Sequence, residues 1–178
     1  MEIINGGVCA PKGFTANGIH CGIRKNKTKR DLSLIYSEKR ATVACVYTSN
    51  LVKGAPIAVT KENVADGFAQ AIICNSGNAN TCNANGIEVA KAMCLECGNA
   101  LGISANDVVV ASTGVIGQPL DLTPIKEGLP ELVKGLGYNS QLAAQGIMTT
   151  DTALKEISLS FEIGGKTCAI GGIAKGSG

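Results

Sequence analysis

Two hydroxyl side chains and a glycine follow an apolar run in the stretch DVVVASTGVIG, residues 107–117, where the sequence best supports chemistry. Residues 108–110 are three consecutive valines, which is typical of a strand covered on both faces. Ser112, Thr113 and Gly114 then interrupt the apolar run. A strand end holds hydroxyls and backbone N–H groups at fixed positions, and glycine lets a reacting carbonyl come close to the backbone. The stretch suits stabilisation of an oxyanion, although the local pattern also fits an ordinary junction between strand and loop.

A second unusual stretch, NSGNANTCNANG, covers residues 75–86 and follows a buried run at residues 71–74. Asn and Gly readily adopt the turn and left-handed conformations that bulkier residues resist. The side-chain amides could bind a ligand. Turn formation is the simpler interpretation, and we favour it.

The eight cysteines and the single histidine bear on metal and redox chemistry. Cys94 and Cys97 form a C-x-x-C pair, but no second pair has zinc-like spacing and His20 is distant in the sequence. We therefore interpret both thiols as small core residues of a helix, and predict no metal and no cofactor. The sequence has neither a secretory leader nor an apolar run of membrane-spanning length, so reduced thiols and a cytoplasmic protein are expected.

Composition limits the class of protein and its partners. With 178 residues, 45% of them hydrophobic, residues 1–178 suffice for a single domain with a substantial core. Three Tyr, three Phe and no Trp leave no stacking platform for single-stranded nucleic acid. Basic residues gather at positions 24–30 without interleaved aromatics and are followed by Asp31, which indicates a solvated loop. We expect neither nucleic acid nor membrane as a partner.

The first half of the chain reads mainly as strands. Short apolar and β-branched runs predict strands at residues 19–24, 32–37, 41–48, 57–60 and 71–74. A short helix capped by Thr60 is expected to follow the fourth of these.

The clearest helix is expected at residues 86–101. Asn85 can cap it, Glu88 completes a capping box, and a buried stripe recurs at spacings of three and four. The stripe comprises Ala90, Met93, Cys94, Cys97 and Leu101.

Two further helices and a hairpin complete the prediction. Thr123 and Pro124 begin a helical region in which Gly128 and Pro130 favour a break, and Ser140 caps a short helix. Strict alternation at residues 157–163, a Gly164–Gly165 turn and a strand at residues 167–173 predict the hairpin.

Six ordered segments resemble the ornithine acetyltransferase family, the bifunctional ornithine acetyltransferase and N-acetylglutamate synthase of arginine biosynthesis. The resemblance covers essentially the whole chain, whereas any one segment would be a weak signal. The segments are GFTANGIHCGIR (13–24), VYTSNLVKGAPI (46–57), CNSGNAN (74–80), STGVIG (112–117), GIMTTDT (146–152) and GGIAKGSG (171–178).

The resemblance implies an α/β fold of two mixed sheets sandwiched between helical layers. Family members cut themselves before a threonine, which becomes the N-terminal nucleophile of a β chain. The sequence looks like the α chain, a single domain over residues 1–178 that a β chain completes, with α2β2 heterotetramers as the implied assembly. Its AKGSG end follows a predicted strand and reads as interior sequence, without the short tail that precedes the cut.

Four site residues follow from the resemblance. Thr113 and Gly114 match the oxyanion-hole positions of the family, which act through the threonine hydroxyl and the glycine N–H. Thr149 and Lys175 match substrate-binding positions, and the neighbouring Thr150 remains an alternative to Thr149. A lysine suits an amino-acid carboxylate.

The implied reaction is a ping-pong transfer of acetyl from N-acetylornithine to glutamate, without metal or nucleotide. Acetyl-CoA is a second possible donor. Two alternatives stay open: a related self-processing aminopeptidase or amidase, in which water takes the acyl group, and a non-catalytic small-molecule binding subunit. Glutamate-dependent acetyl transfer would separate them.

Overall fold

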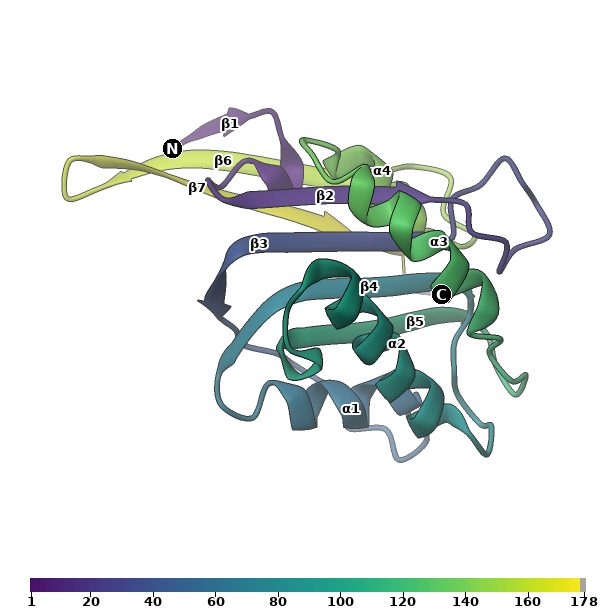
Figure 1. Cartoon of the computed structure of the whole chain (residues 1–178). Coiled ribbons are helices and arrows are strands. Elements are labelled where there is room, and N and C mark those ends of the chain that lie inside the picture. Colours follow the sequence, from purple (N-terminus) through teal and green to yellow (C-terminus); the bar gives the residue numbers. More distant parts are fainter. Residues whose placement is uncertain (177–178) are drawn as a thin grey trace.

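A four-stranded mixed sheet forms the centre of the computed structural model, which describes residues 1–176 (Figure 1). Its strands, in spatial order, are β2 (Phe14–Ile19), β3 (Leu32–Thr42), β4 (Phe68–Asn78) and β5 (Val108–Val115). The first three are antiparallel, and β5 runs parallel to β4. Parallel neighbours require a crossover, and the carboxyl ends of β4 and β5 consequently lie side by side.

A three-stranded antiparallel sheet lies next to the central sheet, and its long hairpin projects beyond it in Figure 1. Its strands are β1 (Glu2–Ile4), β6 (Lys155–Ile163) and β7 (Lys166–Ala174), with β6 in the middle. Ile163 pairs with Lys166, which confirms the predicted hairpin and its Gly164–Gly165 turn. Ser177 and Gly178, the end of the AKGSG segment, lie outside the described residues.

Helices cover both faces of the central sheet. The helices are α1 (Ala55–Asn63), α2 (Gly86–Leu101), α3 (Thr123–Lys134) and α4 (Ser140–Ile147), with 3-10 turns η1 (Gly7–Cys9) and η2 (Ala105–Asp107). Helices α2 and α3 pack on the face that is toward the viewer in Figure 1, α1 packs along the edge strand β5, and α4 packs against β2 and β3 on the other face. Among the described residues, no helix combines the length and hydropathy that crossing a bilayer requires.

The main apolar core lies between the central sheet and α1, α2 and α3. Its largest fully buried apolar side chains are Leu32, Leu34, Ile73, Met93, Ile125 and Leu132. Cys94 and Cys97 belong to the same core, as predicted from the sequence. Burial raises the pKa of Cys94 to about 11 and that of Cys97 to about 12, so both thiols stay neutral at physiological pH.

Several strands of the first half of the chain differ from the prediction. The strand expected at residues 19–24 is wrong beyond Ile19, where β2 ends, because the backbone N–H groups of Cys21, Gly22 and Arg24 donate to the buried carboxylate of Asp31. The strands expected at residues 32–37 and 41–48 are one strand, β3, which ends at Thr42. An irregularity between Tyr36 and Ala41 lets this strand change register without ending.

The strand expected at residues 57–60 is part of helix α1. Pro56 lies in the first turn, where a missing N–H costs no helical hydrogen bond. Thr60 is inside the helix and does not cap it. Its Oγ1 donates to the carbonyl of Val110 at 2.8 Å and accepts from the N–H of Val110 at 3.1 Å, which ties α1 to β5.

Helix α3 continues through Pro130 without the expected break. An interior proline costs about 3 kcal/mol of helix stability, whereas burying a large apolar side chain gains about 1.5–3 kcal/mol. Three such side chains, Ile125, Leu129 and Leu132, are buried on this helix and outweigh the penalty. Asn85 is the N-cap residue of α2, as predicted, but its side chain makes no capping hydrogen bond. The predicted cap at Ser140 is wrong, because Asn139 is the N-cap residue of α4 and the Oγ of Ser140 accepts from the N–H of Val8.

The α/β fold class with two sheets and helices is confirmed, but the strands are less covered than the sequence implied. Val109 is only half-buried, so β5 is not enclosed on both faces. On the β6–β7 hairpin, Ile157, Ile163 and Ile170 are 56%, 63% and 57% exposed.

Candidate active site

All four site residues expected from the sequence line one cavity of about 500 Å³. The cavity lies at the carboxyl ends of β4 and β5, near the C-terminal end of the described chain (Figure 1). Its lining residues are Arg24, Gly77, Thr113, Gly114, Val115, Thr149, Thr150 and Lys175. Segments that are far apart in the sequence therefore converge on one space.

The oxyanion-hole candidates Thr113 and Gly114 lie within strand β5, not in a loop after it. Contrary to the expected break, β5 runs to Val115 and β4 to Asn78, and Gly77 pairs with Gly114. Gly114 has φ of 135°, and a Cβ there would lie 2.3 Å from the carbonyl carbon of Gly77. Only glycine fits this close approach, which fixes the direction of the Thr113–Gly114 peptide.

Thr113 lies between two cavities. A second cavity of about 540 Å³ also touches Thr113 and Gly114, and its other lining residues come from residues 45–60, 79–81, 109–112 and Ile116. Thr113 is half-buried, and its hydroxyl makes no hydrogen bond within residues 1–176. This hydroxyl is thus available to donate to a ligand from a fixed position on a strand.

Two hydrogen bonds to main-chain carbonyls place the segment that carries Thr149. The Oγ of Ser76, which lies on β4, donates to the carbonyl of Gly146 at 2.7 Å. The guanidinium of Arg24 donates through Nη2 to the carbonyl of Met148. Thr149 is half-buried and Thr150 exposed, and both line the cavity, so the alternative between them stays open.

Asp151 joins the two segments that carry Thr149 and Lys175. Its carboxylate accepts the N–H of Thr149 at 3.2 Å, the N–H of Gly176 at 2.5 Å and the Nζ of Lys155 at 2.8 Å. The side chain is only 2% exposed. The Lys155 ammonium first, then the two backbone donors, hold the pKa of this carboxyl well below its usual range. Asp151 is therefore a charged clamp that sets the distance between two walls of the cavity.

Lys175 supplies a positive charge at the cavity wall. Its Nζ donates to the carbonyl of Gly176 at 2.8 Å, and an ammonium has further N–H donors for a ligand. The neighbouring thiol of Cys74 is not a nucleophile, since burial raises its pKa to about 12 even though the charge of Lys175 opposes the shift.

The remaining candidate groups have structural roles. His20 contacts Asp31 at 3.1 Å and the carbonyl of Lys29 at 3.0 Å, and it does not line the 500 Å³ cavity. The interpretation of residues 75–86 as turns is wrong for residues 75–78, which continue strand β4 beside β5. In the later part of the stretch, the Nδ2 of Asn80 donates to the carbonyl of Gly86 at 2.9 Å. No group of three or more potential metal ligands occurs within residues 1–176.

Sequence reasoning missed two residues of the site. Arg24 was included in the solvated basic loop, yet it is half-buried and lines the cavity. The sequence held a signal for Arg24, because this residue is the last of the GFTANGIHCGIR segment. Asp31 lies seven residues later, is buried, and accepts the backbone N–H of Arg24 at 2.9 Å. Asp151 lies inside the GIMTTDT segment, but its three donors could be found only in the fold.

Fold and site together define an α/β protein with a cavity lined by two cations and by threonine side chains. Hydroxyl and backbone N–H donors at fixed positions can stabilise the negative charge that develops during acyl transfer. The comparisons with known proteins agree with this class. The ArgJ family model matches residues 15–178, and the chain belongs to the ArgJ family.

Curated relatives match the chain over its whole length. It is 46% identical to the arginine biosynthesis bifunctional protein ArgJ of Caldanaerobacter subterraneus and 43% identical to the glutamate N-acetyltransferase of Methanocaldococcus jannaschii. In both comparisons the match covers 100% of this chain and 44% of the relative. The chain thus spans less than half the length of these relatives.

Solved structures match the fold closely. The arginine biosynthesis bifunctional protein of Bacillus halodurans superimposes with a TM-score of 0.93 at 37% identity. The ornithine acetyltransferase of Mycobacterium tuberculosis, solved in complex with ornithine, gives 0.92 at 32% identity. Each match covers 99% of this chain and 95% of the solved chain.

Proposed function

We propose that the chain is the α chain of a glutamate N-acetyltransferase that transfers acetyl from N-acetylornithine to glutamate in arginine biosynthesis. The observation that carries the proposal is the convergence of Thr113, Gly114, Thr149 and Lys175 on one cavity. The names of the relatives supply the reaction class, since they include bifunctional arginine biosynthesis proteins and a glutamate N-acetyltransferase.

The nucleophile is proposed to come from a second chain. The residues that line the cavity include no histidine and no carboxylate that could activate Thr113, Thr149 or Thr150. An N-terminal threonine activates itself, because its own α-amine takes the proton of its hydroxyl. The two cavities on either side of Thr113 offer space for the substrate and for that threonine.

Coverage of the relatives supports a divided polypeptide. The solved chains are matched over 95% of their own length, whereas the curated relatives are matched over only 44% of theirs. The exposed Ile157, Ile163 and Ile170 give a second chain an apolar surface to cover. We propose that residues 1–178 form one domain that this β chain completes, and that the αβ pairs associate as α2β2. A cytoplasmic location is proposed as well, in keeping with eight free cysteines.

In the proposed reaction the threonine hydroxyl attacks the acetamide carbonyl of N-acetylornithine. The carbonyl oxygen gains negative charge, which the hydroxyl of Thr113 and the N–H of Gly114 stabilise. The C–N bond then breaks, the proton passes to the leaving α-amine of ornithine, and an acetyl ester remains. The α-amine of glutamate attacks this ester, and the threonine regains its proton. Lys175 holds the α-carboxylate that both substrates share.

The test uses the complete gene product. Intact mass and N-terminal sequencing of every co-purifying chain should reveal a second chain that begins with threonine. Purified protein should then release ornithine from N-acetylornithine and form N-acetylglutamate only when glutamate is present. Acetate release without glutamate would support a hydrolase, and substrate binding without turnover would support a binding subunit. Either result would contradict the transferase.

A further inference from the structure

Arg24 is held in the cavity wall by the loop that carries it. The carboxylate of Asp31 is fully buried and accepts the N–H of Cys21 at 2.6 Å, of Gly22 at 3.3 Å and of Arg24 at 2.9 Å. The side chain then passes over Gly77, where a Cβ would lie 2.9 Å from the Cγ of Arg24. Both constraints reduce the conformational freedom of the guanidinium before any ligand binds.

The guanidinium has donors to spare. Its Nη2 binds the carbonyl of Met148, and no other partner for its N–H groups occurs within residues 1–176. A guanidinium carries five N–H donors in a planar arrangement that matches a carboxylate. Arg24 can therefore keep its bond to Met148 and still bind an anion in the cavity.

The cavity is positively charged. Its lining residues include two cations, Arg24 and Lys175, and no carboxylate. The nearby Asp151 is already engaged by Lys155 and by two backbone N–H groups, and Cys74 stays neutral because burial raises its pKa to about 12. The charge balance therefore favours a ligand with two anionic groups.

We propose that Arg24 binds the side-chain carboxylate of the acceptor glutamate and so sets acceptor specificity. This inference rests on the proposed function, in which Lys175 binds the α-carboxylate common to both substrates. Glutamate has a second carboxylate, whereas N-acetylornithine carries an ammonium in its side chain. Arg24 thus distinguishes the acceptor from the donor.

The experiment compares glutamate with glutamine as acceptors, in the enzyme assembled from the complete gene. Glutamine keeps the α-carboxylate and replaces the side-chain carboxylate by a neutral amide. In wild type, kcat/KM for glutamate should exceed that for glutamine. Arg24→Gln should reduce this preference by about tenfold or more, as expected for the loss of a hydrogen bond to a charged group. Single-turnover release of ornithine from N-acetylornithine should change much less.

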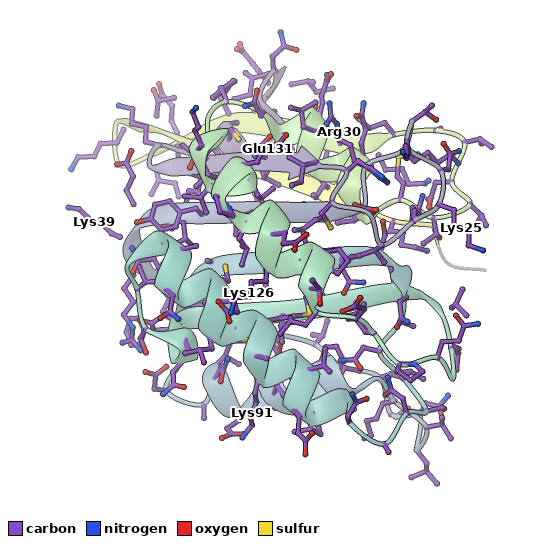
Figure 2. All side chains as sticks on the ribbon, turned by 45° about the vertical axis from the view of Figure 1, so that its right-hand side comes forward. Lys25, Arg30, Lys39, Lys91, Lys126 and Glu131 are labelled. Carbon is purple, nitrogen blue, oxygen red and sulfur yellow. The ribbon has the colours of Figure 1, made fainter. Side chains whose placement is uncertain are left out.

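Two further variants complete the design. Arg24→Lys keeps the charge and should retain more of the glutamate preference than Arg24→Gln. Lys25→Gln removes the same charge from the next residue of the loop, which is exposed and labelled at the periphery in Figure 2, and should leave the preference unchanged.

An unchanged ratio of glutamate to glutamine in Arg24→Gln would overturn the inference. Equal losses with both acceptors and with the donor would also overturn it, since Arg24 would then only position Met148 and the adjacent Thr149. Failure of the proposed function is a separate result, because wild type itself would not transfer acetyl to glutamate.

Discussion

Replacement of Gly114 by alanine should damage both stability and catalysis. Gly114 has φ of 135°, and its Cβ would lie 2.3 Å from the carbonyl carbon of Gly77 and 2.6 Å from the nitrogen of Asn78. Backbone strain in this region costs about 1–3 kcal/mol, and overpacking against fixed atoms costs about 1–3 kcal/mol more. The combined loss in the free energy of unfolding is about 2–6 kcal/mol.

The activity should fall for a related reason. The backbone can relieve the clash only by moving the Thr113–Gly114 peptide away from β4. That movement displaces the N–H and the hydroxyl proposed to face the oxyanion, and loss of one such donor lowers kcat by about 10²–10³-fold. The assays are the thermal unfolding midpoint and the kcat for acetyl transfer in the assembled enzyme.

Gly117 provides the matched control. It lies three residues further on, has φ of 77°, and nothing lies within 4 Å of the position of its Cβ. Gly117→Ala should therefore cost only the left-handed penalty of about 1–2 kcal/mol and retain kcat. Equal unfolding midpoints and equal kcat values for the two variants would show that the close contact between β4 and β5 has no role in the site.

Three further predictions concern the cavity residues. Thr113→Ala should lower kcat by about 10²-fold or more while Thr113→Ser retains most activity; similar losses in both variants would exclude the hydroxyl as the donor. Lys175→Ala should raise KM for both substrates by about tenfold or more, whereas Lys166→Ala, at the exposed hairpin turn, should not, and failed assembly with normal KM would make Lys175 structural. Asp151→Asn should lower the unfolding midpoint at neutral pH. The pKa of Asp151 is lowered mainly by Lys155, so the stability that its carboxylate contributes is present above the ordinary aspartate pKa and is lost as the pH falls through the lower folded value. The difference in unfolding midpoint between variant and wild type should therefore narrow below about pH 4. A difference that does not depend on pH would contradict the clamp.

The sequence by itself determined the elements whose signals are local. Helix α2 follows from an apolar stripe at helical spacing, and the β6–β7 hairpin from strict alternation around Gly164–Gly165. The resemblance carried by six segments named the family and four site residues. The helix and hairpin signals lie within neighbouring residues, since helical and strand periodicities extend over only a few residues, whereas the resemblance depends on all six segments together.

The tertiary structure decided what depends on partners remote in the sequence. Residues 57–60 read as a strand, yet Thr60 is in a helix whose position is fixed by hydrogen bonds to Val110, fifty residues away. From the sequence, Arg24 was interpreted as a solvated charge. In the fold its backbone N–H donates to the buried Asp31 and its guanidinium donates to the carbonyl of Met148. Burial and strand pairing bring together residues with no local relation, so the cavity at the ends of β4 and β5 exists only in the folded chain.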